Sequence, residues 1–328
     1  MKSILHLATF FTYFLRFFPP EFSHLIALIG LKALSNMGIR LISLPHYKKE
    51  FLGISFRNTL GLSAGLDKNG DYIEALDTLG FGFIELGTVT PKSQSGNDKP
   101  RLWRNSKNKD LINKMGFNNK GVKYLISKLD KKKFNSVIGI SIGKNALTDL
   151  KDSVDDYIYC LKEAYPYADY IAVNISSPNT KDLRELEGKS YFEDLVDALI
   201  KSKEKLKNEH GSKPIFIKVS PDMEENDLLN LCQVVKKKKI EGIIATNTTI
   251  NHPYKYPGGM SGKSLLKTSN KVLENIRKEL GPDFLLIGCG GVNSKETYDS
   301  KIRSGADLVQ IYTGFIFKGP KLIEDILK

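Results

Sequence analysis

The chain has 328 residues, 41% of them hydrophobic, which is enough to bury one large core of barrel size. Its net charge of +12 comes from 49 basic against 37 acidic residues. The lysine runs at 131–133 and 236–239 lack the interleaved aromatic residues of a nucleic-acid-binding surface, so we expect these runs to be solvated helix ends. Three cysteines without C-x-x-C spacing exclude a disulfide framework and a zinc ribbon, and they fit a reducing compartment.

The first 50 residues differ in pattern from the rest of the chain. Residues 4–18 are strongly apolar but stop at Pro19, so they are too short for a membrane span of about 20 residues, and no signal-peptide cleavage site follows. Residues 25–42 predict a second apolar helix, interrupted by basic residues such as Arg40. Two apolar helices with basic edges are typical of a segment that lies in the membrane interface. The alternative is a helical pair that covers one end of a barrel.

From residue 51 onwards, short apolar runs alternate with helical patterns, as in a parallel α/β fold. A small leading strand is expected over 51–56. Eight β/α units then match a (β/α)8 TIM barrel, which typically has about 250 residues. An open doubly wound sheet is the alternative, but no strand is followed by a G-x-G-x-x-G fingerprint. The expected barrel strands are 60–63, 82–86, 137–141, 170–173, 215–219, 242–245, 285–288 and 307–311, with helices at 191–207, 224–237, 271–280 and 295–304.

Polar residues follow the expected strands at the end where barrels place their active sites. The fourth strand leads into Asn174-Ile-Ser-Ser-Pro-Asn-Thr180, a cluster that is costly to bury without partners. Alone it could be an Asx or Ser turn; similar signals after the other strands favour a site. Lys218 lies inside the fifth apolar run, where a charged lysine needs an anionic partner. Gly290-Gly291 and residues 312–314 follow the last two strands, where barrels commonly bind phosphate.

These side chains fit a planar ligand and a flavin better than a metal. There is no HExxH motif, Cys/His/Asp cluster or suitably spaced carboxylate pair, so we expect no metal site and neither metal-dependent hydrolysis nor glycoside chemistry. Carboxamides present a donor beside an acceptor, which complements the edge of an imide or pyrimidine. The glycine-lined site indicates a phosphate-bearing cofactor. A lysine facing it suits a flavin, whose reduced form carries negative charge near N1.

The motifs resemble those of dihydroorotate dehydrogenase, specifically its membrane-associated, quinone-using class 2. The resemblance covers essentially the whole chain. It implies FMN as cofactor, oxidation of (S)-dihydroorotate to orotate in pyrimidine (UMP) biosynthesis, and a membrane quinone as electron acceptor. Class 1 members carry a cysteine base and lack the helical segment, whereas position 177 is serine here. One departure is Thr180-Lys-Asp-Leu-Arg184, where the family more often has proline and glycine. The matching motifs are Ala64-Gly-Leu-Asp-Lys68, Asn113-Lys-Met-Gly-Phe-Asn118, Asn174-Ile-Ser-Ser-Pro-Asn-Thr180, Thr246-Asn-Thr248, Ser261-Gly262 and Gly290-Gly291.

The resemblance also implies a role for individual residues. Ser177 would be the base that takes the C5 proton while a hydride passes from C6 to flavin N5. His24, in the motif Pro20-Glu-Phe-Ser-His24, would line the quinone path with Arg104 and Tyr312; a packed or helix-capping histidine is the alternative. Substrate would be bound by Lys68, Asn113, Lys114, Met115, Gly116, Phe117, Asn174, Asn179, Asn247 and Thr248. FMN would be held by Ala64, Gly65, Thr88, Asn145, Asn174, Lys218, Thr246, Gly262, Gly291, Tyr312 and Thr313.

These arguments divide the chain into residues 1–50, an apolar helical pair for membrane attachment and quinone access, and residues 51–328, an FMN-binding barrel. We expect a monomer, bound peripherally to anionic lipid at the cytoplasmic face of a bacterial cell membrane, because no Arg- and Ser-rich leader is present. Two other functions stay open: a flavoprotein of the same barrel that acts on RNA uridines, which needs an RNA-binding extension, and a barrel that binds flavin or lipid without catalysis.

Overall fold

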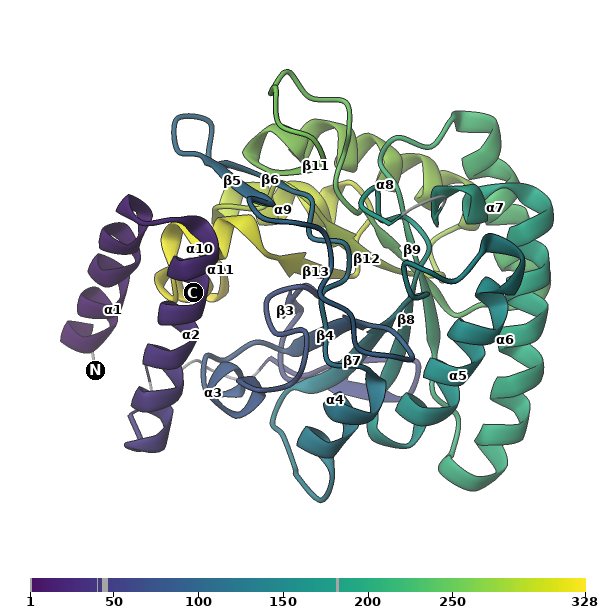
Figure 1. Ribbon diagram of the computed structural model, residues 1–328, viewed down its shortest axis with the longest axis horizontal. Helices are drawn as coiled ribbons and strands as arrows, with labels where there is room; N and C mark the ends of the chain where they lie inside the picture. The colour runs from purple at the N-terminus through teal and green to yellow at the C-terminus, as the bar shows by residue number, and fades with distance from the viewer. Residues whose placement is uncertain (1, 40, 43–46, 181–182) are drawn as a thin grey trace.

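The computed structural model describes residues 2–39, 41–42, 47–180 and 183–328 (Figure 1). Eight parallel strands close into a barrel in the order β3-β4-β7-β8-β9-β10-β12-β13, which confirms the TIM-barrel prediction. Each strand coincides with one of the eight predicted apolar runs. They are β3 (Leu60–Leu62), β4 (Phe83–Val89), β7 (Val137–Ile142), β8 (Tyr170–Asn174), β9 (Ile215–Val219), β10 (Gly242–Ala245), β12 (Leu285–Cys289) and β13 (Leu308–Ile311).

Helices cover the outside of the barrel because each has one apolar face. In α8, for example, Val272, Leu273, Ile276 and Leu280 are buried on one side. The four predicted helices are confirmed, although α8 begins five residues earlier than expected. The α-helices are α3 (Ile73–Asp77), α4 (Val122–Leu129), α5 (Ser153–Ala164), α6 (Lys189–His210), α7 (Glu225–Lys238), α8 (Leu266–Leu280), α9 (Lys295–Arg303), α10 (Thr313–Lys318) and α11 (Lys321–Leu327). Short 3₁₀ turns are η2 (Leu150–Asp152), η3 (Tyr165–Tyr167), η4 (Leu183–Glu187) and η5 (Lys263–Leu265).

A hairpin, rather than the single strand predicted at 51–56, precedes the barrel. Strands β1 (Lys49–Phe51) and β2 (Ile54–Phe56) pair antiparallel, and both turn residues, Leu52 and Gly53, have positive φ. That geometry belongs to a two-residue hairpin turn, so the prediction was wrong because two turn residues were read as strand. The Phe56 ring packs edge-on against Phe83 at the start of β4, with ring centroids 5.7 Å apart. The hairpin thus covers the amino-terminal end of the barrel.

A small antiparallel sheet stands over the opposite end and was not predicted. Its order is β11-β6-β5, formed by β11 (Gly259–Gly262), β6 (Asp110–Asn113) and β5 (Leu102–Asn105), and Figure 1 shows these strands together beyond the carboxyl ends of the barrel strands. Each strand has only four residues, and β5 is half-buried throughout, so neither length nor apolar pattern marks it in the sequence. The sheet supplies Asn113 and Gly262 to the functional site.

The amino-terminal segment forms two helices, of which the first packs against α10 and α11 and the second against α3 and β5 (Figure 1). In place of the predicted ranges 4–18 and 25–42, the structure has helix α1 (Lys2–Phe14), the turn η1 (Leu15–Phe17) and helix α2 (Pro20–Asn36). The prediction of a helix over 25–42 was wrong at both ends, because proline is tolerated in the first helical turn and Gly38, with φ of 72°, follows the helix end. The basic residue Arg40 lies outside the described residues. Among the described residues, no helix is long and apolar enough to span a bilayer.

Candidate active site

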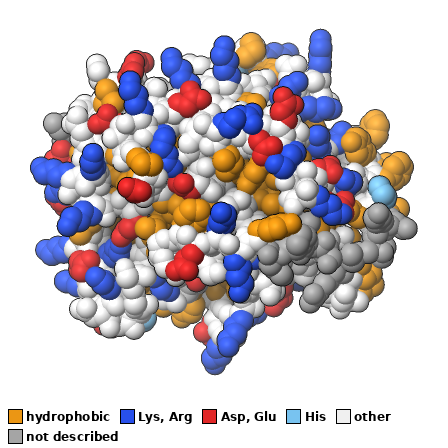
Figure 2. All heavy atoms as spheres, turned by 180° about the vertical axis from the view of Figure 1, so that it is seen from behind, with side chains coloured by type: hydrophobic (Ala, Val, Ile, Leu, Met, Phe, Trp, Pro, Cys, Tyr) orange, Lys and Arg blue, Asp and Glu red, His pale blue; other side chains and the backbone are white. Residues whose placement is uncertain are grey.

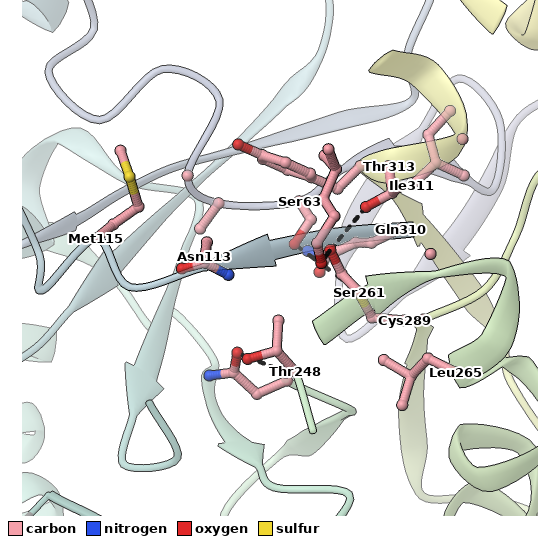
Figure 3. Close-up of a pocket in the computed structure, with 18 of the residues that line it drawn as sticks. Ser63, Asn113, Met115, Thr248, Ser261, Leu265, Cys289, Gln310, Ile311 and Thr313 are labelled. Atoms are coloured by element: carbon pink, nitrogen blue, oxygen red, sulfur yellow. Dashed lines mark hydrogen bonds between the residues drawn. The ribbon is translucent and has the colours of Figure 1, made fainter. Parts of the chain in front are cut away.

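The carboxyl ends of the barrel strands surround a cavity of about 490 Å³, bordered by nearly all the predicted site residues. Figure 3 shows side chains from separate segments converging on it, among them Ser63, Asn113 and Thr248. From the predicted substrate set and the base, the border includes Lys68, Asn113, Met115, Gly116, Phe117, Asn174, Ser177, Asn179, Asn247 and Thr248. From the predicted flavin set, it includes Ala64, Gly65, Thr88, Asn174, Lys218, Thr246, Gly262, Gly291, Tyr312 and Thr313.

Two predicted contact residues are placed elsewhere. Asn145 uses its side chain to tie down the loop after β4: its Nδ2 donates to Thr90 Oγ1 and Gln94 Oε1, and its Oδ1 accepts from the Lys92 backbone. Lys114 does not border the cavity, and its backbone N–H donates to the Arg101 carbonyl. A direct contact of Asn145 with cofactor and of Lys114 with substrate therefore stays a prediction.

Carboxamides from separate elements pair with one another in the cavity wall. Asn179 Nδ2 donates to Asn113 Oδ1 at 2.9 Å, and Asn247 Nδ2 donates to Asn174 Oδ1 at 3.2 Å. Asn174 Nδ2 in turn donates to Thr88 Oγ1 at 3.0 Å. The buried Asn179 Oδ1 has no hydrogen-bond partner among the described residues, so it can accept from a ligand N–H. The wall thus offers donors and acceptors side by side, as the sequence predicted.

Ser177 lies at the cavity three residues beyond the end of β8. It is almost fully buried, and its Oγ accepts from the Asn179 backbone N–H at 3.3 Å. A residue that the sequence analysis missed, Arg184, holds this loop: it donates to the Ser176 and Thr248 carbonyls and pairs with Asp222 at 2.8 Å. Arg184 belongs to the departure from the family pattern, whose residues 181 and 182 lie outside the described residues. The sequence could not reveal the role of Arg184, because all its partners lie on other segments or on the backbone.

Lys68 is a half-buried cation that lacks a carboxylate within ion-pair distance in the described part of the chain. Its Nζ donates to the Gly65 carbonyl at 2.9 Å. Burial lowers the pKa of Lys68 to about 8, aided by the charge of Arg101 and opposed by Glu21 and Asp67. A half-buried ammonium of this kind favours an anionic ligand, because the ligand's charge offsets the cost of desolvation.

The flavin set contains a glycine cradle and a paired lysine. Gly290 and Gly291 both have positive φ, and a Cβ on Gly291 would lie 2.4 Å from the Leu266 Cα, so only glycine fits between this loop and the start of α8. Such a loop lets the backbone approach a phosphate closely. The anionic partner that Lys218 requires is Glu85, 3.3 Å away on β4. Glu85 was missed because it lies inside an apolar run.

A second, apolar cavity of about 710 Å³ lies between the amino-terminal helices and the barrel. Its wall includes Phe10, Phe14, Leu28 and Leu31, together with the predicted quinone-path residues His24, Arg104 and Tyr312. Both cavities share His24, Tyr312, Arg16, Leu102 and Leu111.

His24 and Tyr312, which border both cavities, are neutral at physiological pH. Burial and the charge of Lys68 lower the pKa of His24 to about 4, although a hydrogen bond with the Leu66 backbone raises this pKa in part. Burial also raises the pKa of Tyr312 to about 12. The boundary between the polar and apolar cavities therefore carries two uncharged polar rings.

Comparisons with known proteins agree with this geometry. The family model "Dihydroorotate dehydrogenase" matches residues 46–328. The chain is 44% identical over 319 residues to dihydroorotate dehydrogenase (quinone) of Hamiltonella defensa subsp. Acyrthosiphon pisum and 45% identical over 319 residues to that of Vibrio vulnificus strain YJ016; in each case 94% of this chain and 95% of the relative are covered. A crystal structure of DHODH in complex with ferulenol from Eimeria tenella superposes with a TM-score of 0.85 at 30% identity, over 94% of this chain and 89% of that one. The chain therefore belongs to the dihydroorotate dehydrogenase family.

Proposed function

We propose that this protein oxidises (S)-dihydroorotate to orotate with FMN as cofactor and passes the electrons to a membrane quinone, as a step of pyrimidine biosynthesis. The observation that carries the proposal is the pair of adjoining cavities. One is lined by carboxamides, the half-buried Lys68 and the buried Lys218, the other is apolar, and His24 and Tyr312 border both. The family is flavin-dependent in general, and the relatives above are named as quinone enzymes.

Substrate binding follows from the chemistry of the polar wall. The half-buried ammonium of Lys68 pairs with the carboxylate of dihydroorotate, the only full charge that the ligand carries. The carboxamide pairs Asn113–Asn179 and Asn174–Asn247 bind the imide edges of the ring, because each pair retains donor and acceptor capacity. Met115, Gly116, Phe117 and Thr248 complete the enclosure.

Ser177 removes the proton from C5 of the substrate. FMN bound in this cavity would supply the acceptor for the hydride from C6. A serine must pass its own proton onward to act as a base. The buried Thr180 Oγ1, three residues further along the same loop and without a hydrogen-bond partner among the described residues, can relay this proton to solvent water as it gives up its own. The Asn179 N–H that points at Ser177 Oγ stabilises negative charge as it develops there.

FMN fits the remaining part of the polar cavity. The Gly290-Gly291 loop suits the FMN phosphate, because its backbone can approach the phosphate closely. A Cβ at Gly291 would instead collide with Leu266 at the start of α8. Thr313 belongs to the same end of the cavity, and its Oγ1 lies 2.8 Å from Ser261 Oγ (Figure 3). Lys218, from inside the barrel, faces the ring system and balances the charge of its reduced form.

Residues 1–50 serve as a membrane-attached access segment for quinone, and residues 51–328 as the catalytic barrel. Phe10 and Phe17 are 69% and 87% exposed, although aromatic rings are usually buried. Figure 2 shows hydrophobic side chains at the right-hand edge of the molecule, where the amino-terminal helices lie in that view. An apolar surface of this kind suits peripheral attachment of a monomer to the cytoplasmic leaflet of a bacterial membrane, with anionic lipid attracting the basic residues.

Anaerobic mixing with dihydroorotate tests the proposal. The flavin absorbance of the purified protein is expected to bleach with one equivalent of substrate, with orotate formed in equal amount, and to return on addition of a quinone. An RNA-modifying flavoprotein or a non-catalytic flavin-binding barrel would show no bleaching with this substrate. Persistence of the oxidised spectrum in protein that holds flavin would contradict the proposal.

A further inference from the structure

Behind the polar cavity, Glu85 is the centre of a buried network inside the barrel. It lies on β4, its side chain is 0% exposed, and it does not border the cavity. Gln310 Nε2 on β13 donates to its Oε2 at 2.7 Å and Tyr170 OH on β8 donates to the same oxygen at 3.2 Å. Lys218 Nζ on β9 donates to Oε1 at 3.3 Å. Four strands thus contribute to one buried carboxylate, and two of its partners, Lys218 and Gln310, border the cavity.

The surrounding barrel is shaped to hold this network. A Cβ at position 139 would lie 2.0 Å from the Tyr170 ring, so only a glycine there lets that ring cross the barrel interior and reach Glu85. Burying an unpaired carboxylate is costly, and three donors offset that cost. Burial alone would lower the pKa of Lys218, but the attraction of Glu85, with a smaller part from Cys289, raises it above its ordinary value. Lys218 therefore stays charged.

We propose that Glu85 is a positioning residue that keeps Lys218 protonated and, by partly cancelling its charge, sets the reduction potential of the bound flavin below the value that Lys218 alone would give. The proposal rests on the FMN site proposed above. A cation beside the flavin ring stabilises the negative charge of the reduced form and raises the potential. A carboxylate behind that cation weakens this stabilisation. Glu85 thus prevents the reduced cofactor from being held too tightly to give its electrons to quinone.

The test is a spectroelectrochemical titration of four flavin-loaded proteins at pH 6. In Glu85→Gln, the affinity for reduced relative to oxidised FMN is expected to rise about tenfold, which corresponds to about +30 mV for a two-electron couple. Lys218→Met is expected to shift the potential in the opposite direction. The double variant, which lacks both charges, should lie between the two single variants, and the cycle measures their coupling.

A second readout covers the case in which Lys218 loses its proton once Glu85 is neutral. Reduction of the flavin would then draw a proton onto Lys218, and the potential of Glu85→Gln would change by about 30 mV per pH unit more steeply than that of the wild type. Either the raised potential or the steeper slope supports the proposal. An unchanged potential and an unchanged slope would overturn it.

Tyr170→Phe is the matched control. It removes a donor from the same carboxylate but leaves both charges and the ring in place, so its potential is expected to stay close to that of the wild type. A purely structural role of Glu85 would give Tyr170→Phe and Glu85→Gln the same small effect and would overturn the proposal. If Glu85→Gln does not fold, the wild-type slope decides: two protons taken up per two electrons between pH 7 and 9 would show that Glu85 does not keep Lys218 charged.

The outcomes separate this inference from the proposed function. Failure of the wild-type protein to bind FMN, or no change of potential in Lys218→Met, would contradict the FMN site itself. A lowered potential in Lys218→Met with no effect of Glu85→Gln would leave the FMN site intact and overturn only the role of Glu85.

Discussion

Ser177 depends strongly on its surroundings, because a serine hydroxyl is a poor base unless its own proton has an exit. The structure places it at the cavity, nearly buried, with a backbone N–H directed at its Oγ. Cys160, Cys232 and Cys289 are free and buried, and Cys289, which borders the same cavity, lies at the end of β12 rather than in the loop after β8. The proposed function assigns the proton transfer at C5 to the Ser177 hydroxyl.

Replacing Ser177 by alanine is expected to slow flavin reduction by dihydroorotate roughly 10²–10⁴-fold, the usual contribution of a positioned base, while FMN and orotate still bind. Stopped-flow absorbance measures the rate. Ser176→Ala is the matched control: that hydroxyl accepts from Asn247 Nδ2, so its loss should weaken substrate binding more than the limiting rate. Near-wild-type reduction by Ser177→Ala would exclude it as the base. Ser177→Cys should shift the pH optimum downward, since a thiol has a pKa of about 8.5.

The proposed pairing of Lys68 with the substrate carboxylate predicts that orotate binding depends on pH. Its pKa of about 8 means that the side chain is charged at pH 7 and loses its proton as the pH rises through 8. The dissociation constant for orotate is thus expected to be flat below pH 7 and to increase up to about tenfold per unit above pH 8, because only the charged form pairs with the carboxylate. Lys68→Met should bind weakly with no such rise. A wild-type constant that is flat from pH 6 to 9.5 in calorimetric titration would contradict this role.

At the scale of single elements, the loop after β8 is held by the Arg184 side chain. Arg184 joins it to the loop after β10 and to Asp222. Arg184→Met is expected to raise KM for dihydroorotate about tenfold, since hydrogen bonds to a charged group contribute about 1.5–3 kcal/mol, and to speed hydrogen exchange at residues 175–178, with FMN retained. Arg184→Lys, which keeps the ion pair, should lose less. An unchanged KM and exchange pattern in Arg184→Met would show that the loop needs no such tie.

Strands that are buried on both faces could be predicted from the sequence. Elements set by local turns, or by pairing between distant segments, could not. The eight barrel strands are buried on both faces and so read as continuous apolar runs. The hairpin at Leu52-Gly53 and the start of α2 at Pro20 depend on one or two backbone conformations, and the strand pairing of β11 with β6 joins segments almost 150 residues apart. At the site, motif residues were found, but Glu85 and Arg184 were missed because their partners are fixed only by the fold.

At the scale of the whole molecule, the proposed function assigns one half of the reaction to each cavity, oxidation of dihydroorotate to the polar one and reduction of quinone to the apolar one. Helix α2 is tied to the barrel by the ion pair between Glu21 and Arg101, at 3.0 Å, and it places His24 at the boundary. In the proposed attachment to a membrane, the exposed phenylalanines of α1 and η1 would add affinity of roughly 25 cal/mol for each Å² that they bury in lipid. A quinone with a long apolar tail stays in the bilayer, so the proposed function requires the second cavity to lie at the membrane.

The most direct test of this division of labour is to measure the two half-reactions separately in the full-length protein and in a variant that lacks residues 1–45, both in the presence of anionic lipid vesicles. Anaerobic stopped-flow mixing with dihydroorotate follows flavin reduction; mixing of the reduced protein with a long-tailed quinone or with a water-soluble dye follows reoxidation. We expect both proteins to be reduced by dihydroorotate and reoxidised by the dye, and only the full-length protein to be reoxidised rapidly by the quinone. Normal quinone turnover by the truncated protein, or loss of its flavin, would contradict the account.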